Sequence, residues 1–443
     1  MTVLALAFAC SAATLAATDA FSIPFERYVL QQNGLEVILH QDRSLPIAAV
    51  DIWYHAGPIN EAPGRTGFAH LFEHLMFQGS AHVGDDQYFK LLESVGASFI
   101  NGTTDFDRTN YLETVPANRL ELALWLESDR MGFLLDAFTQ QKLDNQRDVV
   151  MNERREGVEN EPYGMSDEKV MQTLFPADHP YHGNVIGSMD DLKAASLDDV
   201  RDFFTRYYSP ANATLVVAGD FNPATAKQLI ERYFGTLPRR PVPDKHVIAT
   251  PPIQGERRVE VKEPVALPRL AFAWLSPAAF APGDSDADVL ALILGNGRSS
   301  RLHKRLVYEL ELAQQVSAVQ ESLALGSVFR VTILGRPGVD AKKLENEAQA
   351  VLDAIVKEPP TEKEVERARN QLTTHMVTAL QLIGGFSGRA DMLNRYNQYL
   401  GSPDYFAKDI DRYRAVTPET VHVLAKSLLA TTQRIVVVTV PDK

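Results

Sequence analysis

The order of apolar and polar residues along the first half of the chain follows two periods. Runs rich in β-branched and aromatic residues predict strands, and runs with apolar residues three and four positions apart predict helices. The pattern predicts strands at residues 35–40 and 48–57, helices at 67–77 and 86–97, a hairpin at 98–115 that turns around residues 105–107, helices at 118–131, 143–160 and 197–208, and a strand at 213–220.

A similar order of elements returns after residue 256. The pattern there predicts a strand at 270–277, helices from about 284 to 310, a strand at 327–335, further helices, and a final helix and strand. The clearest internal repeat aligns residues 196–217 with residues 417–438 without a gap, so that Val200 lies over Val421. Few residues are identical, and any two helix–strand units share part of this pattern. A duplicated fold is nevertheless the simplest interpretation.

The region between the two halves has the composition of a linker. Residues 238–256 contain five prolines and no periodic pattern. A chain of 443 residues is also too long for one ordinary hydrophobic core. We therefore predict an α+β fold with two homologous domains, at residues 21–237 and 257–443, each a mostly antiparallel sheet packed with helices.

Residues 1–20 have the pattern of a signal peptide. No charged residue precedes Asp19, and the apolar run from residue 3 to about residue 15 is too short to cross a membrane. A lipid-modified Cys10 is an alternative, but residues 7–9 are a poor lead-in to such a site. We expect an exported protein, located in the periplasm, with no membrane span. Because Cys10 is the only cysteine, a metal site in the mature chain must use histidine and carboxylate ligands.

The overall charge limits the class of partner. The formal net charge is −13, so the basic surface that phosphate binding requires is not expected. Binding to nucleic acid is therefore disfavoured. An acidic chain is compatible with peptide substrates, although net charge alone selects none.

The stretch HLFEH at residues 70–74 is the strongest candidate for chemistry. His70 and His74 are one helical turn apart and share a face, and Glu73 flanks that face. Two such imidazoles can bind one Zn²⁺ while the glutamate acts on a water molecule. A hydrolytic zinc site needs a third ligand. Glu153 is a good candidate, because with Gln146 and Val150 it forms a stripe that predicts an inward-facing position.

The pattern can also be explained without a metal. A histidine pair at this spacing is more often a solvated helix face than a pair of ligands. The neighbouring residues make that explanation weaker, since Leu71, Phe72 and Leu75 predict a buried helix. Buried imidazole and carboxylate groups need partners, and a metal ion would supply one.

Several segments together resemble one known family. HxxEH is the inverted zincin motif, and its setting is similar to that of the pitrilysin, insulin-degrading enzyme and mitochondrial processing peptidase family. The resemblance rests on seven segments that occur in the family's order: NGLEVILHQD, GFAHLFEHLMFQGS, INGTTDFDRTNY, RDVVMNE, HPYHGNVIG, SPANATLVVAGDF and GNGRSSRLHKRL. The last of them resembles part of the family's second domain. The resemblance implies one Zn²⁺ per chain held by His70, His74 and Glu153, with Glu73 as general base. It also implies that each chain forms a half-shell and that two half-shells enclose a chamber.

Two departures from the family pattern change what we expect of this chain. Gln146 stands where the family usually has a second glutamate that supports the site, which would weaken metal binding or catalysis. Val307 and Gln314 stand where members with a complete site have an arginine and a tyrosine that are thought to hold the substrate carbonyl. The resemblance therefore implies a heterodimer whose homologous partner subunit supplies the missing arginine and tyrosine.

The expected reaction is hydrolysis of internal peptide bonds in short or unfolded peptides. The resemblance implies that the substrate binds as an added strand along Asn101, Gly102 and Thr103. A bulge or bend in a strand that binds nothing is the alternative explanation for Asn101 and Gly102. Two alternatives also remain for the whole chain: a non-catalytic or weakly active peptide-binding half-shell, and another metal-assisted hydrolase with the same ligands.

Overall fold

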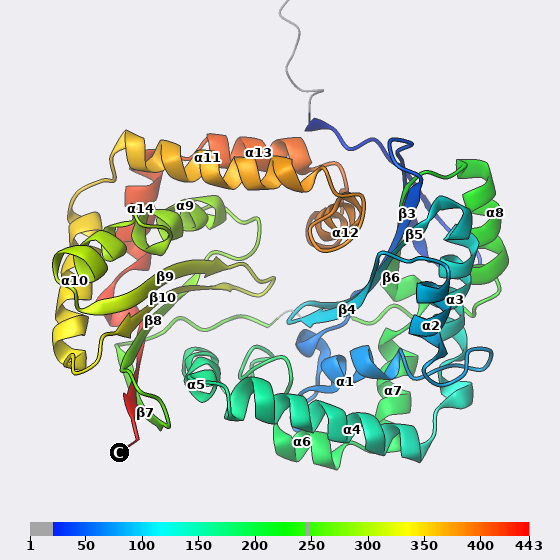
Figure 1. The fold of residues 1–443 in the computed structure, drawn as a ribbon, viewed down its shortest axis with the longest axis horizontal. Coiled ribbons are helices and arrows are strands. Elements are labelled where there is room, and N and C mark those ends of the chain that lie inside the picture. The colour runs from blue at the N-terminus through cyan, green and yellow to red at the C-terminus, as the bar shows by residue number, and fades with distance from the viewer. Residues whose placement is uncertain (1–20, 245–247, 443) are drawn as a thin grey trace, which may run out of the picture.

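The structure is a computed structural model that describes residues 21–244 and 248–442. The predicted signal peptide at residues 1–20 lies outside the described residues. Two sheets occupy opposite halves of the molecule, with most helices on their outer sides (Figure 1). Within the described ranges, no helix is both long and apolar enough to cross a bilayer.

The first sheet has six strands in the order β1-β2-β6-β3-β5-β4, and the second has five in the order β7-β11-β8-β10-β9. Both sheets are mostly antiparallel, which confirms the predicted α+β class. The strands are β1 (Glu26–Val29), β2 (Glu36–Gln41), β3 (Ile47–Tyr54), β4 (Phe99–Asp105), β5 (Arg108–Pro116), β6 (Ala213–Gly219), β7 (Arg257–Glu263), β8 (Arg269–Ser276), β9 (Ala313–Glu321), β10 (Ser327–Gly335) and β11 (Ile435–Pro441).

The described helices surround these sheets. They are α1 (Phe68–Leu75), α2 (Gln87–Ser94), α3 (Leu120–Phe133), α4 (Gln140–Arg154), α5 (Gly164–Leu174), α6 (Met189–Ala194), α7 (Leu197–Tyr207), α8 (Pro223–Phe234), α9 (Asp284–Gly295), α10 (Ala341–Lys357), α11 (Glu362–Ala379), α12 (Arg389–Leu400), α13 (Phe406–Arg414) and α14 (Pro418–Leu428). Short π-helical segments span Arg155–Glu159 and His303–Glu309. The helix predicted at 143–160 therefore differs in its start and in its hydrogen bonding near its end. It begins earlier, after the Thr139 cap, and changes its hydrogen-bonding pattern after Arg154.

The two domains repeat one topology. In the first half, the last strand β6 pairs parallel with β2 and antiparallel with β3. In the second half, the last strand β11 pairs parallel with β7 and antiparallel with β8. The helix before it begins in both halves with a capping box, on Ser196 in α7 and on Thr417 in α14. The side-chain oxygen of each cap accepts a backbone N–H that the first helical turn leaves free. The repeat predicted from residues 196–217 and 417–438 therefore corresponds to one structural unit used twice. The boundaries proposed at residues 237 and 257 stay predictions.

Each sheet has one face covered by its own domain and one covered by a helix of the other domain. α12, from the second half, packs on β3 and β6, where Met392 and Leu393 meet Ala49 and Val216. In return, α5 packs on β7, β8 and β11. Figure 1 shows both helices between the two sheets. This exchange explains why β6 is buried at every position, since a strand covered on both faces has no solvated side.

Candidate metal centre

Glycine contacts fix the place where α1 begins. Gly67, the residue before α1, has φ of 85° and lies directly against Gly187. A Cβ on Gly187 would lie 2.3 Å from the Gly67 nitrogen, so the two backbones approach more closely than side chains would allow. The Glu61 carboxylate accepts backbone N–H groups of Gly67 at 3.1 Å and Ala69 at 2.8 Å. These contacts satisfy free donors at the helix start and hold α1 in position.

The helix α1 buries its apolar side and leaves both histidines partly accessible. Leu71, Phe72 and Leu75 are fully buried. The His70 and His74 side chains are 14% and 23% exposed, and their ring centroids are 4.8 Å apart. The prediction of a largely buried helix with two histidines on one face is therefore confirmed.

The helix α4 brings Glu153 to these histidines across 79 residues of sequence. Its Oε2 lies 3.2 Å from His74 Nε2 and 3.8 Å from His70 Nε2. The three side chains offer ligand atoms that all lie within 4.8 Å of one another. Ligands about 2.1 Å from a tetrahedral zinc ion lie about 3.4 Å apart. The donor set and its spacing therefore fit three of the four ligand positions of a tetrahedral Zn²⁺.

One expectation about Glu153 was wrong in part. Gln146 and Val150 are buried as predicted, but the Glu153 side chain is 49% exposed. Glu153 lies one residue before α4 ends, and its carboxylate extends toward His70 and His74. Arg154 provides the anchor instead. It is 6% exposed and pairs with Glu168 at 2.9 Å.

The electrostatic environment favours neutral imidazole beside an ionised carboxylate. Burial, reinforced by His74, lowers the pKa of His70 to about 4. A hydrogen bond from His74 lowers the pKa of Glu153, against the opposing effect of burial. Metal ions bind the unprotonated forms of both groups. Burial is also the main cause that raises the pKa of Glu73.

Glu73 lies beside strand β4, on the same helix as His70 and His74. Its Oε2 accepts a hydrogen bond of 2.7 Å from the Thr104 hydroxyl. The backbone of Gly102 also lies close, because a Cβ built there would be 3.1 Å from Glu73 Cγ. A carboxylate in this position can exchange a proton with a water molecule or a leaving group.

The residues predicted to bind substrate lie on the edge strand of the first sheet. β4 is the last strand in its sheet, with Asn101 exposed, Gly102 buried and Thr103 intermediate. Its register with β5 runs without interruption from Phe99 to Asp105. β4 therefore has no bulge at these residues, and their binding of a peptide stays a prediction. Arg108 supports the strand from β5 by donating to the Thr103 carbonyl at 2.9 Å.

The remaining predicted residues lie elsewhere. Gln146 is two turns before Glu153 on α4. Val307 is partly buried against the core of the second domain, and Gln314 is exposed on β9, the edge strand of the second sheet. Thr104 and Arg154, which support Glu73 and α4, were not predicted from the sequence. Thr104 could have been found from strand alternation, since it shares a sheet face with Gly102.

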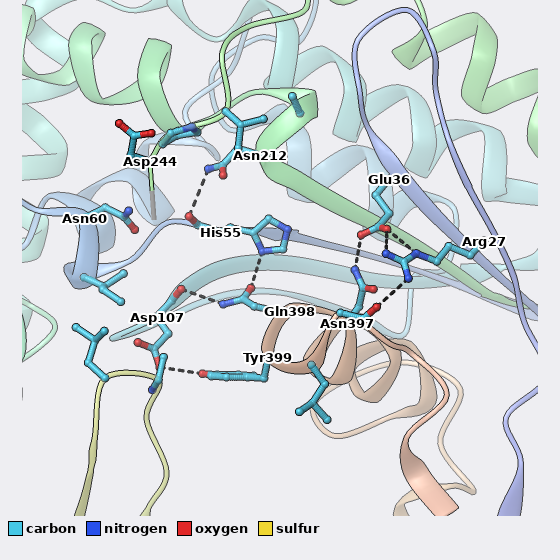
Figure 2. A pocket seen from close by; sticks show the side chains of 18 residues that line it. Arg27, Glu36, His55, Asn60, Asp107, Asn212, Asp244, Asn397, Gln398 and Tyr399 are labelled. Atoms are coloured by element: carbon cyan, nitrogen blue, oxygen red, sulfur yellow. Dashed lines mark hydrogen bonds and ion pairs between the residues drawn. The ribbon is translucent and has the colours of Figure 1, made fainter. Parts of the chain in front are cut away.

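A separate cavity lies at the junction of the two domains. It has a volume of about 700 Å³ and its lining includes His55, Asp107, Asp244, Gln398 and Tyr399. Figure 2 shows Asp107, Gln398 and Tyr399 joined across this cavity by hydrogen bonds. None of its lining residues belongs to the predicted metal or substrate sites.

Comparisons with known proteins place this arrangement in a family. A sequence profile described as Insulinase (Peptidase family M16) matches residues 36–181, and a profile described as Peptidase M16 inactive domain matches residues 194–372. The zinc protease PqqE of Helicobacter pylori is 30% identical over 397 residues, which cover 88% of each chain. A probable mitochondrial-processing peptidase subunit beta of Arabidopsis thaliana is 23% identical, over 90% of this chain and 76% of its own.

Solved structures give the same result. The crystal structure of a protease from Helicobacter pylori matches with a TM-score of 0.88 and 27% identity, over 95% of this chain and 100% of its own. The periplasmic protease PqqL of Escherichia coli matches with a TM-score of 0.75 and 19% identity over 47% of its own chain, which shows a common fold. With matches across both domains and a relative at 30% identity over most of its length, the chain belongs to peptidase family M16, the insulinase family.

Proposed function

We propose that this protein is a zinc metalloendopeptidase in which His70, His74 and Glu153 hold one Zn²⁺ and Glu73 acts as general base. The observation that carries the proposal is that ligand atoms of His70, His74 and Glu153 lie within 4.8 Å of one another. The Glu73 carboxylate is on α1, the helix that also carries both histidines. The name zinc protease, given to several relatives, supports the same metal. Gln146 would support the ligand set from α4 without the negative charge that a glutamate would add.

The roles follow from the chemistry of each side chain. Bound zinc would polarise the peptide carbonyl and make its water ligand more acidic. Glu73 accepts a proton from the attacking water and then delivers it to the leaving amine. Oε2 of Glu73 is engaged by Thr104, which leaves Oε1 for this transfer.

The substrate class follows from the edge strand. An extended peptide can add to β4 and hydrogen-bond with the backbone at Asn101, Gly102 and Thr103. Because this contact reads backbone more than side chains, short or unfolded peptides of varied sequence are the expected substrates. Folded proteins do not offer a free strand of this kind.

The proposal includes a partner subunit and an exported location. Val307 and Gln314 do not provide the cationic and phenolic groups that would stabilise a developing oxyanion. We infer that a homologous subunit supplies an arginine and a tyrosine, and that the two half-shells enclose the substrate in a chamber. The predicted signal peptide supports location in the periplasm, and so does the description of a structural neighbour as a periplasmic protease.

The test compares the wild-type protein with Glu73→Gln. Both proteins are purified with zinc, assayed for metal content, and incubated with an unstructured peptide, alone and with the homologous partner. We expect equal zinc content and a loss of cleavage of at least about 1000-fold in the variant. His70→Ala should lose the metal as well.

Two outcomes would change the proposal. A wild-type protein without stoichiometric zinc, or cleavage that survives Glu73→Gln, would favour the non-catalytic peptide-binding half-shell. Full activity of the chain without a partner would leave the peptidase in place but contradict the heterodimer.

A further inference from the structure

Strand β4 contacts Glu73 through two neighbouring positions on one face. Side chains alternate along a strand, so Gly102 and Thr104 both point toward α1, whereas Thr103 points to the opposite face. Thr104 Oγ1 donates to Glu73 Oε2 at 2.7 Å. The Thr103 hydroxyl instead bonds with Asn110 at 2.5 Å.

Contacts on the carbon chain of Glu73 restrict it further. A Cβ on Gly102 would lie 3.1 Å from Glu73 Cγ, 3.1 Å from Phe77 Cε2 and 3.2 Å from Tyr111 Cδ1. Glu73 therefore packs against the backbone of β4 where that backbone has no side chain. The hydroxyl of Thr104 then fixes the orientation of the carboxylate at its end.

Thr104 also packs against β5. Its hydroxyl oxygen lies 3.4 Å from that of Thr109. Because the Thr109 hydroxyl donates its proton to the Ala56 carbonyl at 2.9 Å, the Thr104 proton stays available for Glu73. A threonine has two heavy atoms on Cβ and few accessible rotamers. The Thr104 hydroxyl therefore has few alternatives to its contact with Glu73.

We propose that Thr104 is a positioning residue that holds the general base Glu73 in one orientation. This inference rests on the proposed function. The Thr104 hydroxyl occupies Oε2 of Glu73 and keeps Oε1 directed at the water to be deprotonated.

The test uses Thr104→Val, which keeps the side-chain shape and removes the hydroxyl, and Thr104→Ser, which restores it. Thr373→Val is the matched control, because Thr373 in α11 uses its hydroxyl for a 2.8 Å bond to the Arg369 carbonyl within the same helix. With the zinc-loaded protein, its partner and an unstructured peptide, we expect Thr104→Val to lower kcat about 10-fold with little change in KM. Thr104→Ser should recover most of kcat, and Thr373→Val should match the wild type.

A structural readout makes the test independent of activity. In crystal structures of the metal-free proteins, the Glu73 carboxylate should take one orientation in the wild type and in Thr104→Ser, and more than one in Thr104→Val. Unchanged kcat with a single Glu73 orientation in Thr104→Val would overturn the inference while leaving the peptidase proposal intact. If the wild type binds no zinc, or its cleavage survives Glu73→Gln, the proposed function fails instead.

Discussion

The Tyr399 hydroxyl donates a hydrogen bond of 3.0 Å to Oδ2 of Asp107 and so joins α12 to the turn between β4 and β5. The same carboxylate accepts from the Tyr181 hydroxyl, and from the backbone N–H of Ala324 at 2.9 Å. Asp107 is only 5% exposed. One buried side chain therefore connects the tip of the β4–β5 hairpin with the second domain at two places, the turn between β9 and β10 and the end of α12.

Asp107→Ala should destabilise the fold by about 2–4 kcal/mol, because it leaves several buried donors without an acceptor. Tyr399→Phe removes one donor only and should cost about 1 kcal/mol. Asp198→Ala is the control, since that side chain is 95% exposed. Urea unfolding at neutral pH measures all three. Equal stability of Asp107→Ala and wild type would contradict a role for Asp107 in joining the domains.

Asp107 should also make the stability depend on pH. Burial, reinforced by Asp105, raises its pKa from the ordinary value of 3.8 to about 6. Between these values the folded state binds more protons than the unfolded state, so the free energy of unfolding falls as pH rises. Asp107→Asn does not titrate. The stability of wild type relative to this variant should therefore fall by about 2–3 kcal/mol from pH 4 to pH 7. A difference that is constant or grows with pH would contradict this assignment.

Arg154 should matter to metal binding although it touches no metal ligand atom. Arg154→Met would leave Glu168 buried without its charge partner, and would remove donors to Asn184 and to the Gly187 carbonyl. We expect a loss of about 3–5 kcal/mol in stability and a zinc affinity at least about 10-fold weaker, since the end of α4 that carries Glu153 loses its anchor.

The neighbouring Arg155→Met is the control for that change, because Arg155 is exposed and its side chain bonds to Asn152 within the same turn. Unfolding and competition with a chelator give the two measurements. Wild-type zinc affinity in a folded Arg154→Met protein would show that Glu153 is held by other contacts.

The close backbone contact between Gly67 and Gly187 can be tested by substituting Gly187, with Gly297 as a control of similar φ. Gly187 has φ of 78° and a Cβ there would lie 2.3 Å from backbone, whereas Gly297 has φ of 81° and nothing within 4 Å. Gly297→Ala should cost about 1 kcal/mol, from backbone strain alone. Gly187→Ala adds the clash at the start of α1, so it should cost at least about 3 kcal/mol and weaken zinc binding. Similar unfolding midpoints for the two variants would contradict the importance of this contact.

The sequence was sufficient for the parts of the molecule that local patterns determine. The HxxEH spacing on an apolar helix predicted how His70 and His74 lie, and alternation predicted the hairpin that contains Thr104. Contacts between segments far apart in sequence were not accessible in this way. Glu153 is half-exposed although Gln146 and Val150 of the same stripe are buried. The continuous apolar run of β6 indicates a cover on both faces without identifying α12 as one of them. A single sequence gives no information on which helix fills that place.

Because α12 of the second domain packs on the first sheet, we predict that the two domains fold together. Leu393 in α12 is fully buried against the first sheet, so Leu393→Asp would place an unpaired charge on Ala49 and Val216 of the other domain. We expect the first domain to become sensitive to protease as well as the second, in one shared unfolding transition at lower denaturant. Val423→Asp is the control, because Val423 lies on α14 and is 61% exposed. A stable first domain in the Leu393→Asp protein, with the second domain alone unfolded, would show that α12 covers the sheet without stabilising it.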